Sequence, residues 1–382
     1  MPIDDEECLA RLCLLRGKSI GPVRYRVLTE HFGSAREALR GSHKAWRGLG
    51  LPEAGCGALK SPDWRGAERD LVWSREPGHH ILFLGEAGYP SLLAACADAP
   101  IRLFVDGDPG ILNQPQIAIV GSRNPTAGGR DNAFEFARHL ARMGLVVTSG
   151  LALGVDAAAH QGCLKAGPTL AVTGHGPDRI YPPRNKALGE QIRARGAIVS
   201  EYPLGTAAAA RHFPQRNRII SGLSLGALIV EAATRSGSLI TARLAMEQGR
   251  EVFAIPGSIH NPLARGCHAL IREGAKLVET AEDILEELGS LALHLATSTD
   301  ETAETRAPQP SNAPDAEYAA LLDAMGHDPV GVDRLVERTG LTPEAVSSML
   351  LLLELQGHVS ALSGGRYARL LADSDKLQRQ DA

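Results

Sequence analysis

Short apolar runs recur through the middle of the chain, and each is followed by a turn and then by an amphipathic stretch. The first run, residues 117–120, is followed at once by Gly121. Such a run predicts a strand that is buried on both faces. Residues 131–143 place Phe134, Ala137 and Leu140 on one face, which predicts a helix. Strand, glycine turn and helix in this order are typical of the start of a doubly wound α/β domain.

Further runs of the same kind predict the rest of a parallel sheet. They occupy residues 145–148, 170–173, 197–200, 226–230 and 251–255. We therefore expect an α/β fold built on an extended Rossmann-like doubly wound sheet, with its carboxyl-terminal loops along one edge. Two earlier runs, residues 81–84 and 101–105, predict an extra strand or a lead-in to this sheet. The central domain is expected over residues 79–290.

Residues 1–78 predict a helical domain of the SAM or helix-hairpin-helix type. A helix is expected to begin at Pro22, directly after Ile20 and Gly21, and Ser34 is a candidate N-cap of the next helix. Such a helix pair can present backbone N–H groups to a DNA phosphate, and it is also common as a plain packing unit. The pattern leaves both interpretations open.

The carboxyl-terminal part predicts a linker, a small domain and a tail. Residues 291–316 are rich in Ser, Thr, Pro, Ala and acids without periodicity, as in a linker. Residues 317–372 predict three helices and a hairpin at Gly364-Gly365, which together describe a winged helix, and residues 373–382 form a tail. The third helix, residues 342–356, has no Lys or Arg. This favours a protein-binding or regulatory role over duplex reading, because a helix without cations is repelled by phosphates.

Charge is distributed unevenly over the 382 residues. The net charge is −4, yet residues 117–260 contain 16 Lys and Arg against 9 Asp and Glu. A basic middle in an acidic chain is what an anionic ligand on the central domain would require. The six cysteines are scattered without metal-ligand spacing, and there is no signal sequence or membrane-length apolar run. We expect a soluble cytoplasmic protein with reduced thiols, no metal and no membrane association.

The turn after the first strand is the first candidate site. Gly121 and Ser122 can offer backbone N–H groups, and Arg123 adds a guanidinium that can bind two phosphate oxygens. The turn does not follow the dinucleotide pattern G-x-G-x-x-G. The alternative is a glycine turn that carries a surface arginine.

A second candidate is the polar stretch of residues 211–224. It combines arginines with an aromatic ring, as single-stranded nucleic acid requires for phosphates and a base, through Arg211, Phe213, Arg216 and Arg218. The alternative is a solvated helix start with paired arginines and a core phenylalanine. In the neighbouring turns, Asp156 is most simply a partner of the helix dipole or a helix cap. His160 is expected to be structural rather than a catalytic base.

The ordered motifs of the central region resemble those of the DNA-processing protein A (DprA/Smf) family. The resemblance rests on VGSR, SGLALGVDAAAH, YPPRN, SEYPLG, FPQRNRIISGLS, VEA, SGSLITA and IPG between residues 117 and 278. It is looser over the flanking modules. The resemblance implies an extended Rossmann fold, single-stranded DNA binding, protection of incoming DNA, and RecA loading in natural transformation or homologous recombination. It also implies a homodimer, with single-strand-binding protein as a further candidate partner.

The resemblance places the DNA site on the turns of one sheet edge. Many relatives have an arginine where this chain has Leu153, which removes a positive charge from the expected pocket. No catalytic residue, cofactor or metal is expected. The residues expected to bind DNA are Gly121, Ser122, Arg123, Gly150, Arg211, Phe213, Arg216, Asn217, Arg218, Ser236, Gly237 and Ser238.

Two other functions remain open from the sequence. The fold also resembles the lysine-decarboxylase-like phosphoribohydrolases, and Ser236-Gly237-Ser238 with Glu231 or Arg235 is a weak similarity to their nucleotide-processing motif. The expected order of glycines, threonine and glutamate is missing, and fold analogy alone is a weak argument. A purely architectural oligomer without nucleic acid is the third alternative.

Overall fold

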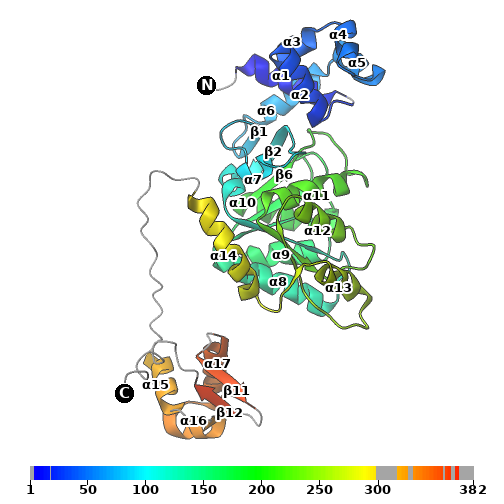
Figure 1. Ribbon diagram of the computed structural model, residues 1–382. Coiled ribbons are helices and arrows are strands. Elements are labelled where there is room, and N and C mark those ends of the chain that lie inside the picture. The colour runs from blue at the N-terminus through cyan, green and yellow to red at the C-terminus, as the bar shows by residue number, and fades with distance from the viewer. Residues whose placement is uncertain are drawn as a thin grey trace. The chain divides into compact units, whose positions relative to one another are not determined.

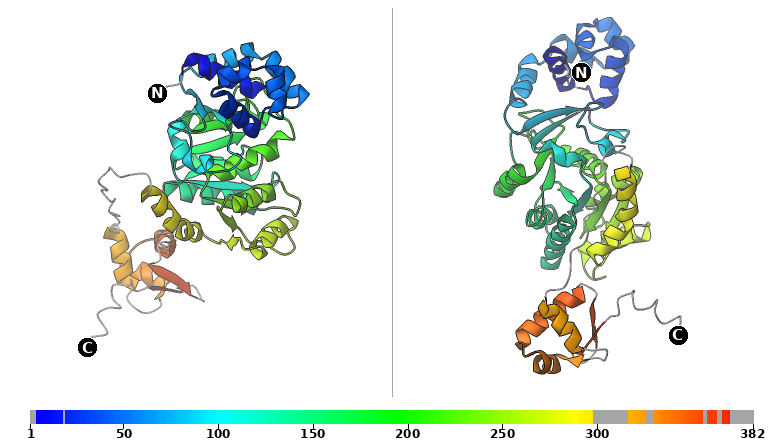
Figure 2. Two further views of the ribbon diagram at one scale, coloured as in Figure 1. Left: turned by 45° about the horizontal axis from the view of Figure 1, so that its top comes forward. Right: turned by 90° about the vertical axis from the view of Figure 1, so that its left-hand side faces the viewer.

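A nine-stranded sheet forms the centre of the amino-terminal unit, and helices cover both of its faces (Figures 1 and 2). The computed structural model describes residues 4–17, 19–297, 316–325, 330–355, 358–362 and 366–369. The chain divides into two compact units, residues 1–301 and 302–382. Each unit is described by itself.

The sheet has the strand order β1-β2-β6-β5-β4-β3-β7-β8-β9. Strands β3 to β9 run parallel to one another, and β1 and β2 extend the sheet as antiparallel strands beside β6. The six predicted parallel strands and the extra run at residues 101–105 are confirmed, and residues 81–83 of the other run also lie in a strand, which ends at Phe83. The bounds are β1 His79–Phe83, β2 Arg102–Gly107, β3 Gln116–Gly121, β4 Val146–Ser149, β5 Thr169–Thr173, β6 Ala197–Ser200, β7 Gly226–Val230, β8 Glu251–Ala254 and β9 Lys276–Leu277.

Strand β3 lies where the chain reverses its direction of travel across the sheet. From β3 the chain proceeds through β4, β5 and β6 on one side, and then returns to β7 on the other side of β3. In a doubly wound sheet, ligands bind in the crevice outside the strand carboxyl ends at such a switch point. The fold therefore predicts that a ligand site would lie at the loops that follow β3 and β7.

Alternate residues of β3 face two different apolar layers. Ile117 and Ile119 pack with helices α8, α9 and α14, whereas Ala118 and Val120 pack with α11, α12 and α13. All four residues are buried, as expected for a strand that is covered on both faces. The helices are α7 Ser91–Ala94, α8 Ala127–Arg142, α9 Val155–Cys163, α10 Lys186–Arg195, α11 His212–Leu223, α12 Ser238–Glu247, α13 Arg265–Arg272 and α14 Ala281–Thr297, with 3-10 turns η1 Pro109–Asn113, η2 Pro183–Asn185 and η3 Pro262–Ala264.

Six short helices precede the sheet and pack on its β1–β2 edge. Trp73 and Cys13 share an apolar cluster with Phe83 and Phe104 of these strands. The predicted start at Pro22 and the Ser34 cap are confirmed: the Ser34 hydroxyl accepts from the Glu37 backbone N–H at 3.1 Å. A domain boundary at residue 78 stays a prediction. The helices are α1 Asp5–Arg16, α2 Pro22–Phe32, α3 Ala35–Arg40, α4 His43–Gly48, α5 Glu53–Lys60 and α6 Trp64–Trp73.

The second unit is a winged helix. Helices α15 Ala316–Met325, α16 Val332–Thr339 and α17 Pro343–Leu355 accompany a sheet of order β10-β12-β11. Its apolar core includes Leu321, Leu335, Val346, Leu350 and Val359. The strands are β10 Val330–Gly331, β11 Val359–Leu362 and β12 Arg366–Arg369. The expected turn at Gly364-Gly365 and the tail at residues 373–382 lie outside the described residues.

Two predicted boundaries were wrong. Helix α8 begins at Ala127, four residues earlier than predicted, because the Thr126 hydroxyl caps the Gly129 N–H at 3.0 Å. Gly128 and Gly129 therefore lie in the first turn of α8. The expected linker begins too early, since α14 continues to Thr297. No helix in the described part of the chain is long and apolar enough to cross a membrane.

The close approach of β3 and β7 gives a test of the switch point. A Cβ at Gly121 would lie 1.8 Å from the Val230 carbonyl oxygen, whereas at Gly128 its nearest neighbour would be 4.0 Å away. We expect Gly121→Ala to lower the free energy of unfolding by about 1–3 kcal/mol or more, as overpacking does. Gly128→Ala, in the exposed first turn of α8, should be neutral or slightly stabilising. Urea denaturation followed by circular dichroism measures both, and equal stabilities would contradict this account.

Candidate functional site

A cleft of about 730 Å³ lies at the carboxyl ends of β3 and β7, where the chain changes direction. We call it the switch-point cleft. Its walls come from the loop after β3, the first turns of α9, α11 and α12, and the loop that contains Tyr181. Among the predicted residues, those that line it are Gly121, Ser122, Arg123, Phe213, Arg216, Asn217, Ser236, Gly237 and Ser238.

Arg123 and Arg235 are the exposed arginines that line this cleft, and Arg123 lies against an aromatic ring. Its guanidinium carbon lies 5.7 Å from the centre of the Phe213 ring, as in a cation–π contact. Within the part of the chain that the structure describes, Arg123 forms no ion pair. Its charge is therefore available to a ligand, which the sequence alone could not decide.

Aromatic rings continue from Arg123 across the cleft. The Phe213 ring lies 5.9 Å from that of Tyr181, and Tyr181 lies 6.4 Å from His175. Tyr181 is 46% exposed, whereas His175 is buried, and burial lowers the pKa of the His175 imidazole. The sequence indicated YPPRN only as a motif of the family resemblance, and Tyr181 was not among the residues expected to bind DNA. The exposed ring beside Phe213 became apparent only in the fold.

The loop that carries Arg123 is held at its first residues. The Ser122 carbonyl accepts from the Val155 N–H at 3.1 Å, and the Ser122 hydroxyl accepts from the Asn124 N–H at 3.1 Å. The first contact ties the loop to the start of α9. Arg123 therefore projects from a backbone that is fixed before any ligand arrives.

Arg216 is a buried arginine, unlike Arg123. Only 4% of it is exposed. Its Nη1 donates to the carbonyl of Gly150 at 2.7 Å and to that of Val172, and its Nε donates to the Asn217 side chain at 3.0 Å. Burial lowers the pKa of Arg216 to about 10, and the nearby Asp156 carboxylate opposes that shift. Arg216 thus lies at the floor of the cleft, where its guanidinium joins the ends of β4 and β5; Gly150 lies outside the cleft lining and accepts from Arg216.

Asp156 lies in the first turn of α9 but does not cap it, because the N-cap is Gly154 and no side chain caps the helix. Asp156 accepts from the backbone N–H groups of Gly150 at 3.2 Å and Ala152 at 3.3 Å. Burial raises the pKa of its carboxyl, and Arg216 opposes this. His160 is fully buried with Nδ1 2.8 Å from the Thr169 hydroxyl, and burial lowers the pKa of its imidazole to about 3. An imidazole of so low a pKa is a weak base near neutral pH.

The serines before α12 hydrogen-bond mainly to one another. The Ser236 and Ser238 hydroxyls are 2.7 Å apart, and the Ser238 N–H donates to the Ser236 hydroxyl at 3.3 Å. Asn217 reaches the Gly237 carbonyl at 3.5 Å. These contacts hold the α12 start against α11 in the wall of the cleft.

Arg211 and Arg218 lie outside the cleft lining. Arg211 is exposed at the N-cap of α11. Arg218 pairs with Glu201 at 2.5 Å and with Asp98 at 3.5 Å. For Arg218, therefore, the alternative of a paired arginine is the one that the structure shows. Leu153, half-buried before α9, is also absent from the cleft lining.

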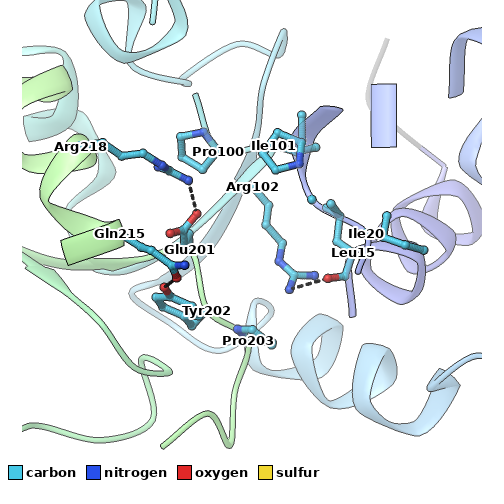
Figure 3. A pocket seen from close by; sticks show the side chains of 12 residues that line it. Leu15, Ile20, Pro100, Ile101, Arg102, Glu201, Tyr202, Pro203, Gln215 and Arg218 are labelled. Carbon is cyan, nitrogen blue, oxygen red and sulfur yellow. Dashed lines mark hydrogen bonds and ion pairs between the residues drawn. The ribbon is translucent and has the colours of Figure 1, made fainter. Parts of the chain in front are cut away.

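Arg218 instead faces a second cavity of about 420 Å³, shown in Figure 3. There the Glu201 carboxylate points toward Arg218, and the Tyr202 hydroxyl donates to Gln215 at 2.9 Å. The opposite wall is formed by Leu15 and Ile20, at the end of α1 and in the turn before α2. The end of α1 and the turn before α2 thus face the same cavity as Arg218. Arg218 therefore lies in a different cavity from the loops after β3 and β7.

Metal chemistry has no evident basis in the described residues. None of their His, Cys, Asp and Glu side chains gather in a group of three or more that could hold an ion. Burial also raises the pKa of the Cys13 and Cys163 thiols, to about 12 and about 11. Thiols with such values are poor nucleophiles.

The fold defines a Rossmann-like domain with a cleft at its switch point. Along the chain, a helix-hairpin-helix module precedes this domain and a winged helix follows it. Family models match each part: DNA recombination-mediator protein A over residues 80–289, the DprA-like N-terminal HHH domain over residues 5–41, and the DprA winged helix domain over residues 305–365. The chain belongs to the DprA/Smf family.

Individual relatives agree with this assignment. Protein Smf of Escherichia coli is 44% identical over 305 residues, which cover 79% of this chain and 80% of Smf. The X-ray structure of DprA from Streptococcus pneumoniae has a TM-score of 0.66 at 35% identity, covering 75% of this chain and 99% of that one. DprA from Helicobacter pylori, whose structure concerns its single-stranded DNA binding mode, has a TM-score of 0.51 at 30% identity, covering 55% and 96%.

Arg123 and Arg216 of the cleft should differ in their effect on stability. We expect Arg216→Met to lower the free energy of unfolding by about 3–5 kcal/mol, because it leaves the buried Asp156 without its counter-charge. Arg123→Met, at an exposed position, should change it by about 0.5 kcal/mol or less. Urea denaturation of the two variants and the wild type tests this. A small effect of Arg216→Met would contradict its role as the floor of the cleft.

Proposed function

We propose that the switch-point cleft binds single-stranded DNA. The observation that carries this proposal is the exposed Arg123 guanidinium, free of ion pairs among the described residues and stacked over Phe213 beside the exposed Tyr181. A cation next to solvent-facing rings matches the two requirements of a single strand, a phosphate partner and a stacking surface. Bases in a duplex are already stacked, so rings offer them little.

Within this proposal the residues divide by role. Arg123, with the Gly121 and Ser122 backbone, contacts a phosphate, and Phe213 with Tyr181 stacks a base. Arg216, held by the Gly150 carbonyl, shapes the floor, while Asn217 and residues 236–238 form part of the wall. Arg211, exposed beside the cleft residue Ala210, remains a proposed phosphate contact. We assign no DNA contact to Arg218, because its charge is paired with Glu201 and Asp98.

The cellular role that we propose follows from family membership. The chain would act in the cytoplasm, protect single-stranded DNA, and load RecA onto it in natural transformation or homologous recombination. A homodimer and contact with single-strand-binding protein belong to the same proposal. The single-stranded DNA binding mode described for the Helicobacter pylori relative supports it. We propose no catalysis, since Asp156 in the cleft is held by two backbone N–H groups and faces Arg216.

Loss of either the cation or a ring should weaken oligonucleotide binding. We expect Arg123→Ala to reduce affinity about tenfold or more and to reduce the slope of log affinity against log salt by about one, because one phosphate contact is lost. Phe213→Ala and Tyr181→Ala should each cost about 1–3 kcal/mol if their rings stack a base. Fluorescence anisotropy with a labelled oligonucleotide at two salt concentrations measures all three.

Arg142→Ala is the matched control for these variants. Arg142 is exposed at the carboxyl-terminal end of α8, away from the cleft, and its loss changes the net charge equally. It should bind DNA as the wild type does. Wild-type affinity in Arg123→Ala and Phe213→Ala would exclude this cleft as the DNA site. Absence of wild-type binding at low salt would favour an architectural role instead.

The RecA proposal has a separate test. The wild-type protein should accelerate the formation of RecA filaments on single strands that are coated with single-strand-binding protein. Arg123→Ala should accelerate it less, because it holds the strand more weakly. Filament growth followed by RecA-dependent ATP hydrolysis measures the effect. An unchanged rate in the presence of DNA-binding wild-type protein would contradict RecA loading while leaving DNA binding intact.

A further inference from the structure

The amino-terminal end of α8 is occupied by a carboxylate of the chain itself. Glu231 directly follows β7 and reaches across to Thr126, the N-cap of α8. Its Oε2 accepts from the Thr126 N–H at 2.7 Å, and its Oε1 accepts from the Thr126 hydroxyl at 2.6 Å. The same hydroxyl accepts from the Gly129 N–H at 3.0 Å. The carboxylate therefore satisfies donors that an anionic ligand would otherwise bind.

The surroundings are shaped to hold Glu231 in this position. A Cβ at Gly129 would lie 2.4 Å from the Glu231 carboxyl carbon, so only glycine leaves room for it. Asn261 donates to Oε1 at 3.2 Å from a third segment. Glu231 itself has a φ of 52°, a left-handed conformation that residues other than glycine rarely adopt. A residue keeps such a conformation only where its neighbours determine it.

The amino-terminal end of this helix is a phosphate-binding position in doubly wound folds. When such folds bind a dinucleotide, the pyrophosphate lies at the amino-terminal end of the helix after the first strand of the nucleotide-binding unit. Here β3 is that strand and α8 is that helix. We infer that Glu231 is a specificity-determining residue, which excludes nucleotide phosphates from the α8 end by occupying it with a fixed negative charge.

The inference goes beyond DNA binding and does not depend on it. A phosphate that approached α8 would have to displace two short hydrogen bonds and would meet a carboxylate at close range. Arg123, on the same loop but directed to the Phe213 ring, remains open to a phosphate. The loop thus has two ends with opposite properties, one closed to anions by Glu231 and one that attracts them.

Inorganic pyrophosphate is the probe that tests this inference. Because Arg123 could also bind the probe, the measurement is made in the Arg123→Ala protein. Adding Glu231→Gln keeps the shape of the side chain but removes its charge. We expect isothermal titration calorimetry to show at least tenfold tighter pyrophosphate binding in the double variant. Glu247→Gln in the same background, an equal charge change on the exposed face of α12, should leave binding unchanged.

An unchanged pyrophosphate affinity in a folded Glu231→Gln double variant would overturn the inference, as would an equal gain with Glu247→Gln. Should the Glu231 variant fail to fold, the inference is tested in the Arg123→Ala protein alone. Its glycines are labelled with ¹⁵N, and their amide resonances are recorded as pyrophosphate is added. A shift of the Gly128 amide resonance at millimolar pyrophosphate would overturn the inference, and an unshifted resonance would support it. Oligonucleotide binding by the protein with Arg123 intact is measured in parallel, so that failure of this inference is distinguishable from failure of the proposed DNA site.

Discussion

The buried guanidinium of Arg216 is the interaction on which the cleft depends. It comes from α11 and hydrogen-bonds to the carbonyls of Gly150 and Val172, which lie at the ends of two adjacent strands. Its charge is balanced by Asp156, which in turn holds the backbone before α9. One side chain thereby joins two strands and two helices. A neutral residue could not satisfy both carbonyls and Asp156 at once.

Three arginines of the central region show how the fold assigns different tasks to one residue type. Arg216 is buried and balanced, Arg218 is paired with Glu201 and Asp98, and Arg123 is exposed without an ion pair among the described residues. An arginine paired with two carboxylates offers little attraction to a phosphate, and a buried one cannot reach it. The distribution of acidic partners therefore leaves Arg123, together with the exposed cleft residue Arg235, to attract an anion in this cleft.

Much of the fold followed from the sequence, because buried parallel strands appear as short apolar runs with glycine turns. The position of the candidate site at the ends of β3 and β7 followed from topology. The sequence could not predict that Arg216 is buried whereas Arg218 is paired with a carboxylate. The two arginines are two residues apart, but Arg216 bonds to Gly150, 66 residues upstream, and Arg218 bonds to Glu201, 17 residues upstream. Tyr181 and the pairing of Glu231 with Thr126 were missed for the same reason, since each depends on segments distant in the sequence.

The anchoring of the Arg123 loop also affects how a ligand is bound. Val155 fixes the backbone just before Arg123, and Glu231 fixes it three residues after. Ordering a mobile loop costs conformational entropy when a ligand binds, and here that cost is met during folding instead. Only the rotamers of the arginine side chain remain to be restricted, and the contact with the Phe213 ring already limits these. Association at this loop would therefore resemble the docking of a strand onto a rigid surface more than the closing of a flexible loop around it.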